Sequence, residues 1–290
     1  MTAPVVLQLL ISGLSVGSLY ALVALALVIP FKASGVLNFG QGETVTLGAY
    51  MALMLSAVVP WWAAFPLTLV AAAALGILIE RLFIRPIVRA PEFTVVIATF
   101  ALGLMIKEAI RIHWEDQVYT LPLPFGTEPW LLLGARLDPD FLWMIVTATV
   151  ITLALVVFFR ATRLGRAMRA VSQNEQAARL MGVGVERIYG ATWAICTALG
   201  ALVGILFAPV TGVEPEMGGI ILKAFVAAVI GGFTSLPGAV VGGLSLGVIE
   251  TFSGAFAGST FKEVVAFVLL ITFLLLRPEG LFAVPAARRV

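Results

Sequence analysis

Charge, cysteine and histidine are all scarce in this sequence. Only 12% of its 290 residues are charged, whereas a soluble globular domain carries about 25%. The single cysteine, Cys196, cannot form an internal disulfide, and its place in the run TWAICTALG predicts a small buried hydrophobe. The single histidine, His113, has no second His or Cys near it, which argues against a metal site. A net charge of +2 is too small to indicate nucleic acid as a partner.

The sequence also lacks the motifs of an enzyme. It contains no G-x-x-x-x-G-K-[ST], so the chain is not expected to bind ATP through a P-loop. No nucleophile–base pair and no carboxylate dyad stands out, which argues against a membrane-embedded enzyme. The N-terminus has neither a basic region nor a clear cleavage site, which predicts a retained first span rather than a signal peptide.

Apolar residues, by contrast, dominate the chain. Hydrophobic residues make up 61% of it and the mean hydropathy is +1.07, which is more than a water-soluble fold could bury. A membrane-spanning helix needs roughly 20 mostly apolar residues. Candidate spans cover residues 5–29, 46–60, 63–83, 93–110, 141–159, 188–210, 220–232, 239–252 and 264–276. We therefore predict an all-α polytopic membrane protein with about 8–10 transmembrane or re-entrant helices, in a single transmembrane domain over residues 1–290.

Two stretches are candidates for broken or re-entrant helices rather than full spans. Residues 220–232 are short and contain Lys223, and residues 34–43 contain the glycine-interrupted sequence NFGQGE. A broken helix exposes backbone amides and carbonyls that must line a cavity or be buried in protein. Such a break therefore indicates a place where a polar path can cross the bilayer.

The distribution of Lys and Arg predicts the orientation of the chain. Short connections on the cytoplasmic side of a membrane protein carry an excess of these residues. With nine full spans and the N-terminus outside, the cytoplasmic side holds Lys32, Arg81, Arg85, Arg89, the arginines between 160 and 187, Arg277, Arg288 and Arg289. The outside then holds Lys107, Arg111, Arg136, Lys223 and Lys262, and the acidic loop 113–140 forms the outer face.

Small residues at fixed spacing predict how the helices pack. Five segments fit G-x-x-x-G, a spacing that strips side chains from one helix face and lets backbones approach closely. They are GLSVG (13–17), GALVG (200–204), GAVVG (238–242), GLSLG (243–247) and GAFAG (254–258). We expect packing within the bundle rather than dimerisation.

A polar island at residues 160–187 interrupts the apolar chain and predicts a short cytoplasmic helix. Ser172-Gln-Asn-Glu175 has the form of a capping box, and Glu175 and Arg179 form an i,i+4 pair in the favourable order. Gly182 stands where a left-handed residue would end the helix, and Ala177, Leu180 and Met181 lie along one side. The alternative is a solvated basic loop with incidental helicity.

Several segments resemble those of a known family. QAARLMG (176–182) is similar to the E-A-A-x-x-x-G motif in the cytoplasmic loop of ATP-binding-cassette (ABC) importer permeases, with Gln in place of Glu. GSLYALVALALVI (17–29) and GVLNFGQGETVTLGAYMA (35–52) resemble the N-terminal signature of Liv-type branched-chain amino acid permeases, more the H-type than the M-type. VIGGFTSLPGAVVGGLSLGVIE (229–250) and RPEGLF (277–282) resemble the C-terminal signature of that family.

This resemblance implies a permease subunit of an importer for branched-chain or related hydrophobic or neutral amino acids. It implies a second Liv-type permease, two cytoplasmic ATPase subunits that bind ATP and Mg, and an extracytoplasmic solute-binding protein as partners. No cofactor is expected in this chain, and the bacterial cytoplasmic (inner) membrane is the expected location. The residues implied to form the ATPase-coupling helix are Ser172, Glu175, Gln176, Ala177, Ala178, Arg179, Leu180, Met181 and Gly182.

Polar residues at membrane depth are candidates for the translocation path, because burying them in lipid is costly. Asn38, Gln41 and Glu43 could contact a zwitterionic amino acid transiently. The alternative is that Asn38 and Gln41 cap a helix while Glu43 lies at the cytoplasmic interface near Lys32. Lys223 and Glu250 are expected to pair with each other near the outer side, as a structural contact rather than a substrate site.

A second hypothesis for the function is a stand-alone secondary carrier driven by an ion gradient. Such a carrier would be expected to hold ionisable residues deep in its core and to contain an internal repeat. Dependence on an ATPase partner is the property that distinguishes the two hypotheses.

Overall fold

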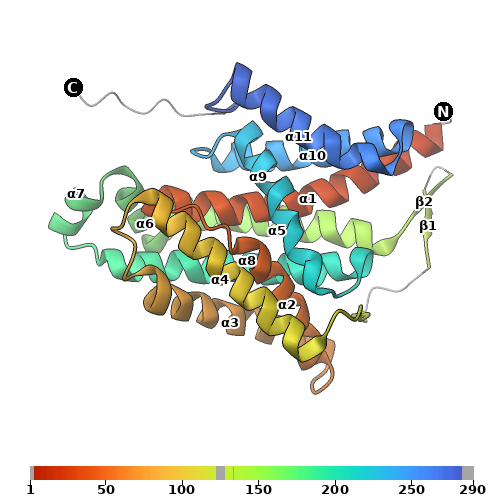
Figure 1. Cartoon of the computed structure of the whole chain (residues 1–290). Coiled ribbons are helices and arrows are strands. Elements are labelled where there is room, and N and C mark those ends of the chain that lie inside the picture. Colours follow the sequence, from red (N-terminus) through yellow and green to blue (C-terminus); the bar gives the residue numbers. More distant parts are fainter. Residues whose placement is uncertain (1–2, 122–127, 133, 283–290) are drawn as a thin grey trace.

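The computed structural model describes residues 3–121, 128–132 and 134–282. Helices account for most of them, and one hairpin forms a two-stranded antiparallel sheet, in which Trp130 pairs with Leu137 (Figure 1). The elements are α1 (Ala3–Ser34), α2 (Gln41–Ser56), α3 (Trp61–Ile79), the π-helix η1 (Glu80–Ile84), α4 (Glu92–Trp114), β1 (Trp130–Leu132), β2 (Ala135–Leu137), α5 (Pro139–Ala161), α6 (Arg163–Gln173), α7 (Glu175–Leu180), α8 (Val185–Thr211), the 3-10 helix η2 (Pro215–Gly219), α9 (Ile220–Gly231), α10 (Leu236–Ala257) and α11 (Ser259–Leu276).

The predicted all-α membrane fold is confirmed. Six helical segments are long and apolar enough to cross a membrane: α1, α3 with η1, α4, α5, α8 and α10. Three shorter predicted segments form α2, α9 and α11, so each of the nine candidate spans overlaps one helix. Within the membrane-spanning helices, 83% of the most apolar stretch of α1 is buried but only 11% of that of α5. α1 is therefore central in the bundle, and α5 lies at its periphery with most of its surface exposed.

The break predicted within residues 34–43 is present, and a second break precedes the predicted short segment 220–232, which forms the continuous helix α9. α1 ends at Ser34, Gly35 adopts φ 71°, and α2 begins only at Gln41. In the same way α8 ends at Thr211, Gly212 adopts φ 79°, and the chain passes through η2 before α9 begins. A positive φ is accessible to glycine without a steric penalty, which is why the chain can turn back sharply at these two positions.

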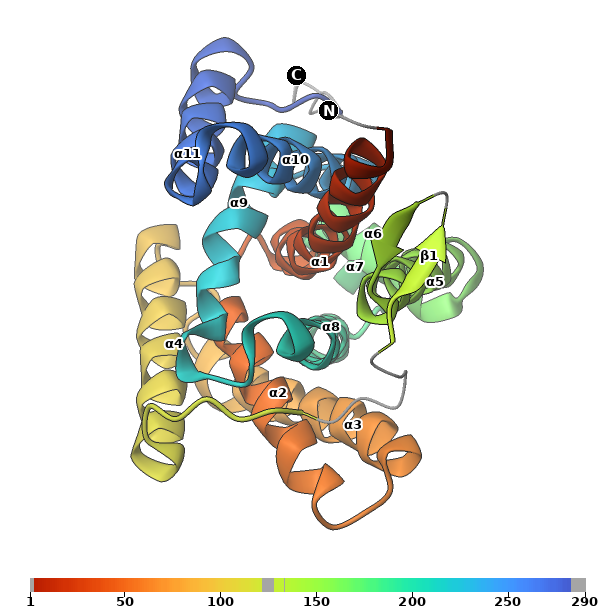
Figure 2. The same cartoon turned by 90° about the vertical axis from the view of Figure 1, so that its right-hand side faces the viewer.

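The two broken helices occupy equivalent places in two inverted halves. α1, break, α2, α3 and α4 form one half, and α8, break, α9, α10 and α11 form the other. α3 packs on α8 where Gly76 meets Thr197, and α10 packs on α1 where Gly243 meets Ala21. α2 and α9 begin beside each other, because Gly42 lies against the Gly218 carbonyl, and they run toward opposite ends of the bundle. Viewed along the bundle, α9 lies between α11 and α4 (Figure 2).

Four of the five G-x-x-x-G segments form close helix contacts. A side chain on Gly17 would meet the Gly243 backbone, and one on Gly204 would meet the Val45 carbonyl. Close backbone approach of this kind gives van der Waals contact that lipid cannot replace. The prediction is wrong for GAFAG, because Gly258 ends α10 at φ 98° with no atom near its Cβ position.

The two ends of the bundle differ in character. The N-terminus and the β1–β2 hairpin lie at one end, and α6 and α7 protrude at the other (Figure 1). At the hairpin end, Tyr119 and Val213 form an isolated backbone bridge that ties the long loop to the second break. The middle of the predicted acidic loop, residues 122–127, lies outside the described residues.

Candidate functional site

The short helix α7 begins at a different residue from the one predicted. Asn174 is its N-cap, and the Asn174 side-chain oxygen accepts a hydrogen bond from the backbone N–H of Ala177 at 2.9 Å. The predicted capping box at Ser172 is wrong: Ser172 lies within α6, and its hydroxyl donates to the Arg169 carbonyl at 3.0 Å. The chain stays helical through Gln173, so the unpaired amides of the next helix begin two residues later.

An ion-pair chain fixes α7 to the start of α8. The Arg179 guanidinium donates to Glu175 at 3.0 Å, as predicted, and also to Glu186 at 2.8 Å. The hydrogen bond to Glu175 raises the pKa of Arg179 above its ordinary value and keeps the side chain charged. Gly182 adopts φ 81° and its N–H donates to the Arg179 carbonyl, which confirms the predicted left-handed C-terminus.

The outer face of α7 is apolar and open. Leu180 and Met181 are 89% and 85% exposed, whereas Ala178 is buried against the bundle. Gln176 and Ala177 are exposed as well. Two large apolar side chains side by side on a polar connecting loop are unusual on a free surface, and such patches mark interaction sites.

A second link runs from α8 to the end of α3, and sequence reasoning missed it. Arg85 forms a two-point ion pair with Glu80 at 3.0 and 2.7 Å, and its guanidinium also reaches the Glu186 carbonyl at 3.3 Å. Glu80 lies in η1, where the π-helical turn redirects the end of α3. α7, α8 and α3 are thus joined through Arg179, Glu186 and Arg85.

At the first break, Asn38 and Gln41 are buried and bonded to each other. The Asn38 amide nitrogen donates to the Gln41 side-chain oxygen at 3.2 Å, and the Gln41 amide donates to the Cys196 carbonyl at 2.8 Å. The alternative that they cap the helix is wrong, because Gly40 is the N-cap of α2 and has no side-chain cap. The Asn38 Oδ1 atom is buried and has no hydrogen-bond partner in the described structure.

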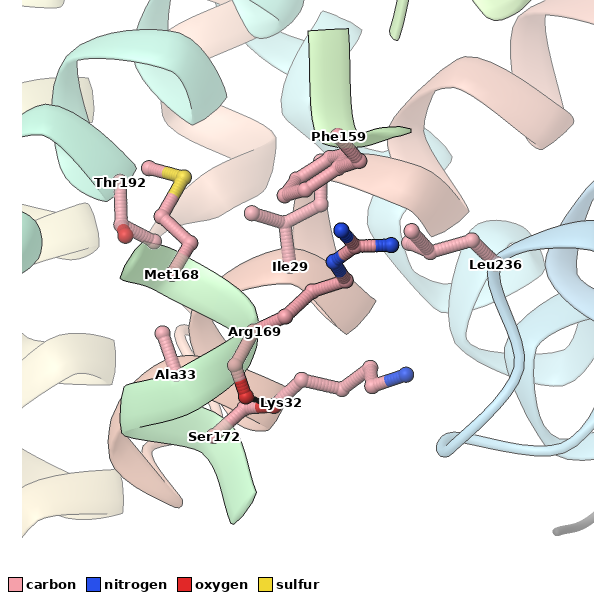
Figure 3. Close-up of a pocket in the computed structure, with 9 residues that line it drawn as sticks. All are labelled: Ile29, Lys32, Ala33, Phe159, Met168, Arg169, Ser172, Thr192 and Leu236. Carbon is pink, nitrogen blue, oxygen red and sulfur yellow. Dashed lines mark hydrogen bonds between the residues drawn. The ribbon is translucent and has the colours of Figure 1, made fainter. Parts of the chain in front are cut away.

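Glu43 lies on another side of α2 from Gln41. Its carboxylate accepts a hydrogen bond from Thr46 at 3.1 Å and packs against Gly218 at the second break. The expectation that Glu43 lies near Lys32 is wrong. Lys32 is at the α6 end, where it lines a cavity with Arg169 and other residues (Figure 3). The start of α2 is at the depth of Gly103 in α4, which places Glu43 well inside the bundle.

The predicted Lys223–Glu250 pair is confirmed and has a third member. Lys223 donates to one carboxylate oxygen of Glu250, and the Tyr20 hydroxyl donates to the other at 2.8 Å. The three residues come from α9, α10 and α1, so the network holds the second half-helix to the central helix. Glu250 is 4% exposed. Each Glu250 oxygen has a partner, which a buried carboxylate requires.

The described residues contain no group of three His, Cys, Asp or Glu side chains that could hold a metal ion. Cys196 is buried and forms no disulfide, as predicted. His113 packs edge-on against Trp114 at the C-terminal end of α4. What the arrangement offers is therefore an exposed apolar helix at one end and two opposed half-helices at membrane depth.

The comparisons with known proteins agree with this geometry. The model of the family "Branched-chain amino acid transport system / permease component" matches residues 9–274. This chain belongs to that family. It is 32% identical to the LivH permease protein of Escherichia coli strain K12, over 98% of this chain and 97% of that protein.

Other relatives in the family show the same pattern. The BraD permease protein of Pseudomonas aeruginosa is 32% identical over 98% of both chains. The LivM permease protein of Escherichia coli is 27% identical over 91% of this chain and 67% of its own length. Among solved structures, PsaBC from Streptococcus pneumoniae in complex with Fab is similar in fold, with a TM-score of 0.51, 14% identity and 94% and 92% coverage of the two chains.

The match to the permease family covers both breaks, α7 and the Lys223–Glu250 pair. Sequence reasoning missed two of the contacts within this region, Gly218 on Glu43 and Tyr20 on Glu250. A Gly-Val dipeptide with a positive φ at the glycine follows both α1 and α8, at 35–36 and 212–213. The dipeptide alone does not mark a break, because it also occurs inside α10 at 247–248.

Proposed function

We propose that this chain is the pore-forming permease subunit of an ABC importer for branched-chain or related hydrophobic and neutral amino acids. α7 is the coupling helix on which a cytoplasmic ATPase docks, and the chain itself binds no ATP. A second similar permease completes the pore, two ATPase subunits bind ATP and Mg, and a solute-binding protein delivers substrate on the other side. The bacterial cytoplasmic membrane is the proposed location, with residues 160–187 in the cytoplasm.

One observation carries this proposal beyond family membership: Leu180 and Met181 stand almost fully exposed on a capped helix. Burying a Leu or Met side chain contributes about 1.5–3 kcal/mol. A partner that covers this face therefore gains a useful part of its binding energy there. The ion pair from Arg179 to Glu186 would carry the resulting motion to α8, and the hydrogen bond from Arg85 to the Glu186 carbonyl would carry it to the end of α3.

The path for the substrate runs past the opposed starts of α2 and α9. Glu43 is the residue proposed to contact the substrate there, because it is half-buried within the bundle and its carboxylate accepts a hydrogen bond from the Thr46 hydroxyl rather than from a cation. Asn38 and Gln41 are proposed to position Glu43 rather than to contact the substrate, since their hydrogen bonds hold the start of α2 against α8. A carboxylate in this place can attract the ammonium group of an amino acid.

The features expected of an ion-coupled carrier do not distinguish it from a permease subunit. An inverted repeat and buried ionisable residues were expected of a carrier, and both occur in this member of a permease family. These features therefore do not separate the two functions. Dependence on an ATPase does.

The experiment is co-purification of the chain with its co-expressed ATPase from detergent. We expect the unmodified chain to retain the ATPase, and a chain with residues 173–182 replaced by a Gly/Ser linker to lose it. Leu180→Asp with Met181→Asp should weaken the association at least tenfold, because about 1.5 kcal/mol or more per side chain is lost. Val118→Asp, at an exposed apolar residue next to the Tyr119–Val213 bridge, is the matched control and should change nothing.

Retention of the ATPase by the doubly charged α7 variant would contradict the coupling role of α7. If the unmodified chain retains no ATPase and alone takes up solute into vesicles under an ion gradient, the carrier hypothesis is correct.

A further inference from the structure

A groove follows the side of the bundle formed by α1, α5 and α10, starting from the end that carries α6. Three adjoining cavities form it. The first, of about 70 Å³, lies beneath α6 and shares Ile29, Phe159 and Leu236 with the second, of about 260 Å³. The third, of about 200 Å³, shares Thr152 and Val240 with the second. The shared residues belong to α1, α5 and α10, so these helices form a continuous groove wall.

The mouth of this groove is cationic. Lys32 from α1 and Arg169 from α6 line the first cavity, and Figure 3 shows both side chains extending away from α6 toward the same open side. Among the residues that the structure describes, no carboxylate forms an ion pair with either side chain. Two neighbouring cations without a counter-charge leave a site for an anion.

The rest of the groove is apolar and has the depth of one membrane leaflet. Thr152 contributes the only polar side chain to the second cavity, where aliphatic side chains and Phe159 dominate. From Phe159 at its mouth to Thr149 in the third cavity, α5 passes through ten residues. That corresponds to about 15 Å of helix, or half of a hydrocarbon core of about 30 Å.

We infer that this groove binds one anionic phospholipid of the leaflet on the α6 side. The phosphate lies between Lys32 and Arg169, and an acyl chain follows α1, α5 and α10. A free phosphate would match the cationic mouth but not the apolar groove, and a neutral lipid would leave the two cations unpaired. Basic pockets between helices on the cytoplasmic side are known to suit acidic headgroups.

The position of the site gives the lipid a structural role. Arg169 is on α6, the helix that leads into α7, whereas Lys32 is at the end of the central helix α1. A phosphate between them joins α6 to the bundle where no ion pair of the described chain does so. The inference does not depend on the transport function, and it holds whatever the chain carries.

The test is native mass spectrometry of the complete complex in detergent, titrated with phosphatidylglycerol or phosphatidylcholine. The unmodified protein should bind one phosphatidylglycerol per chain, at least tenfold more tightly than phosphatidylcholine. Each cation near an anionic lipid is worth roughly fivefold in affinity, so Lys32→Gln with Arg169→Gln should weaken binding about 30-fold. Arg163→Gln, an exposed arginine of α6 that lines none of the three cavities, should leave it unchanged.

A second variant tests the apolar part separately. Val240→Trp fills the groove and should reduce phosphatidylglycerol binding while both cations remain, whereas Leu274→Trp on the exposed face of α11 should not. Equal binding of the two lipids by the unmodified protein would overturn the inference without any variant. So would full displacement by inorganic phosphate together with normal lipid binding by Val240→Trp, since that describes a simple anion site.

Discussion

The carboxylate of Glu43 occupies the space that a side chain at position 218 would need. A Cβ on Gly218 would collide with both of its oxygens. The contact joins the first turn of α2 to the residues just before α9, so the two broken helices meet at an ionisable group. A change at either residue must therefore affect how the two half-helices fit together.

Gly218→Ala should reduce transport at least tenfold, because the new methyl group overlaps the Glu43 carboxylate. The clashing atoms are the end of a flexible side chain, so the carboxylate can turn away at little cost to folding, but it then leaves its native position. Uptake into vesicles containing the assembled importer is the measurement. Glu43→Ala in the same chain should relieve the collision and restore assembly, although transport should stay low if Glu43 contacts the substrate.

The next residue provides a matched control for this prediction. Gly219 has no atom near its Cβ position, so Gly219→Ala should be tolerated. Wild-type uptake by Gly218→Ala would show that the Glu43–Gly218 contact has no importance for transport.

Replacing one member of the Lys223–Glu250 pair should destabilise the protein more than replacing both. Glu250→Leu leaves an ammonium group without its partner, at a cost of about 2–3 kcal/mol, which is below the range for fully buried pairs because Lys223 is partly exposed. Lys223→Met together with Glu250→Leu removes both charges. Thermal unfolding in detergent should give a higher midpoint for the double variant, and a lower one would contradict a purely structural role.

Gly182→Pro should uncouple ATP hydrolysis from uptake. Proline cannot adopt the φ of 81° that ends α7, and it loses the N–H that bonds to the Arg179 carbonyl. Ala177→Arg should act similarly by placing a long charged side chain on the exposed face. We expect uptake to fall while ATPase activity and membrane insertion persist. Gly184→Ala, at φ −74°, should be normal, and coupled uptake by both test variants would exclude α7 as the coupling element.

Cysteine labelling can establish the orientation. Cys196 is buried, so the native chain should give little background with an impermeant thiol reagent. In intact cells Gln176→Cys on α7 should stay unlabelled and Val118→Cys near the hairpin should react, because the two lie at opposite ends of the bundle. Reaction of Gln176→Cys from outside would place α7 on the wrong side for an ATPase.

Much of the fold followed from local features of the sequence. Each candidate span overlaps a helix, and the glycine-interrupted stretch NFGQGE contains a break. Helix formation in lipid is compulsory for an apolar chain, because every backbone group must be bonded within the segment. The ion pair of Glu175 and Arg179 and the left-handed conformation of Gly182 were also predictable. Both are local features, since each depends only on residues within about one helical turn.

The exact ends of helices and the partners of single residues were harder to predict. Ser172 and Asn174 are both good caps, and the choice of Asn174 depended on how far α6 extends. One of the two alternatives for Glu43 placed it at the cytoplasmic interface near Lys32, but the break turns the chain back into the bundle and brings Glu43 to Gly218.

The sequence by itself determined that this chain is a membrane protein, where its helices and the first break lie, and which family it resembles. Only the tertiary structure decided that the two breaks meet, that Tyr20 completes the Lys223–Glu250 pair, and that a cationic groove opens beneath α6. The physical reason is the separation along the chain of the residues that interact. Hydropathy and backbone hydrogen bonds act within a segment, whereas these contacts join residues that are far apart in the chain and brought together by glycine-mediated packing of the helices.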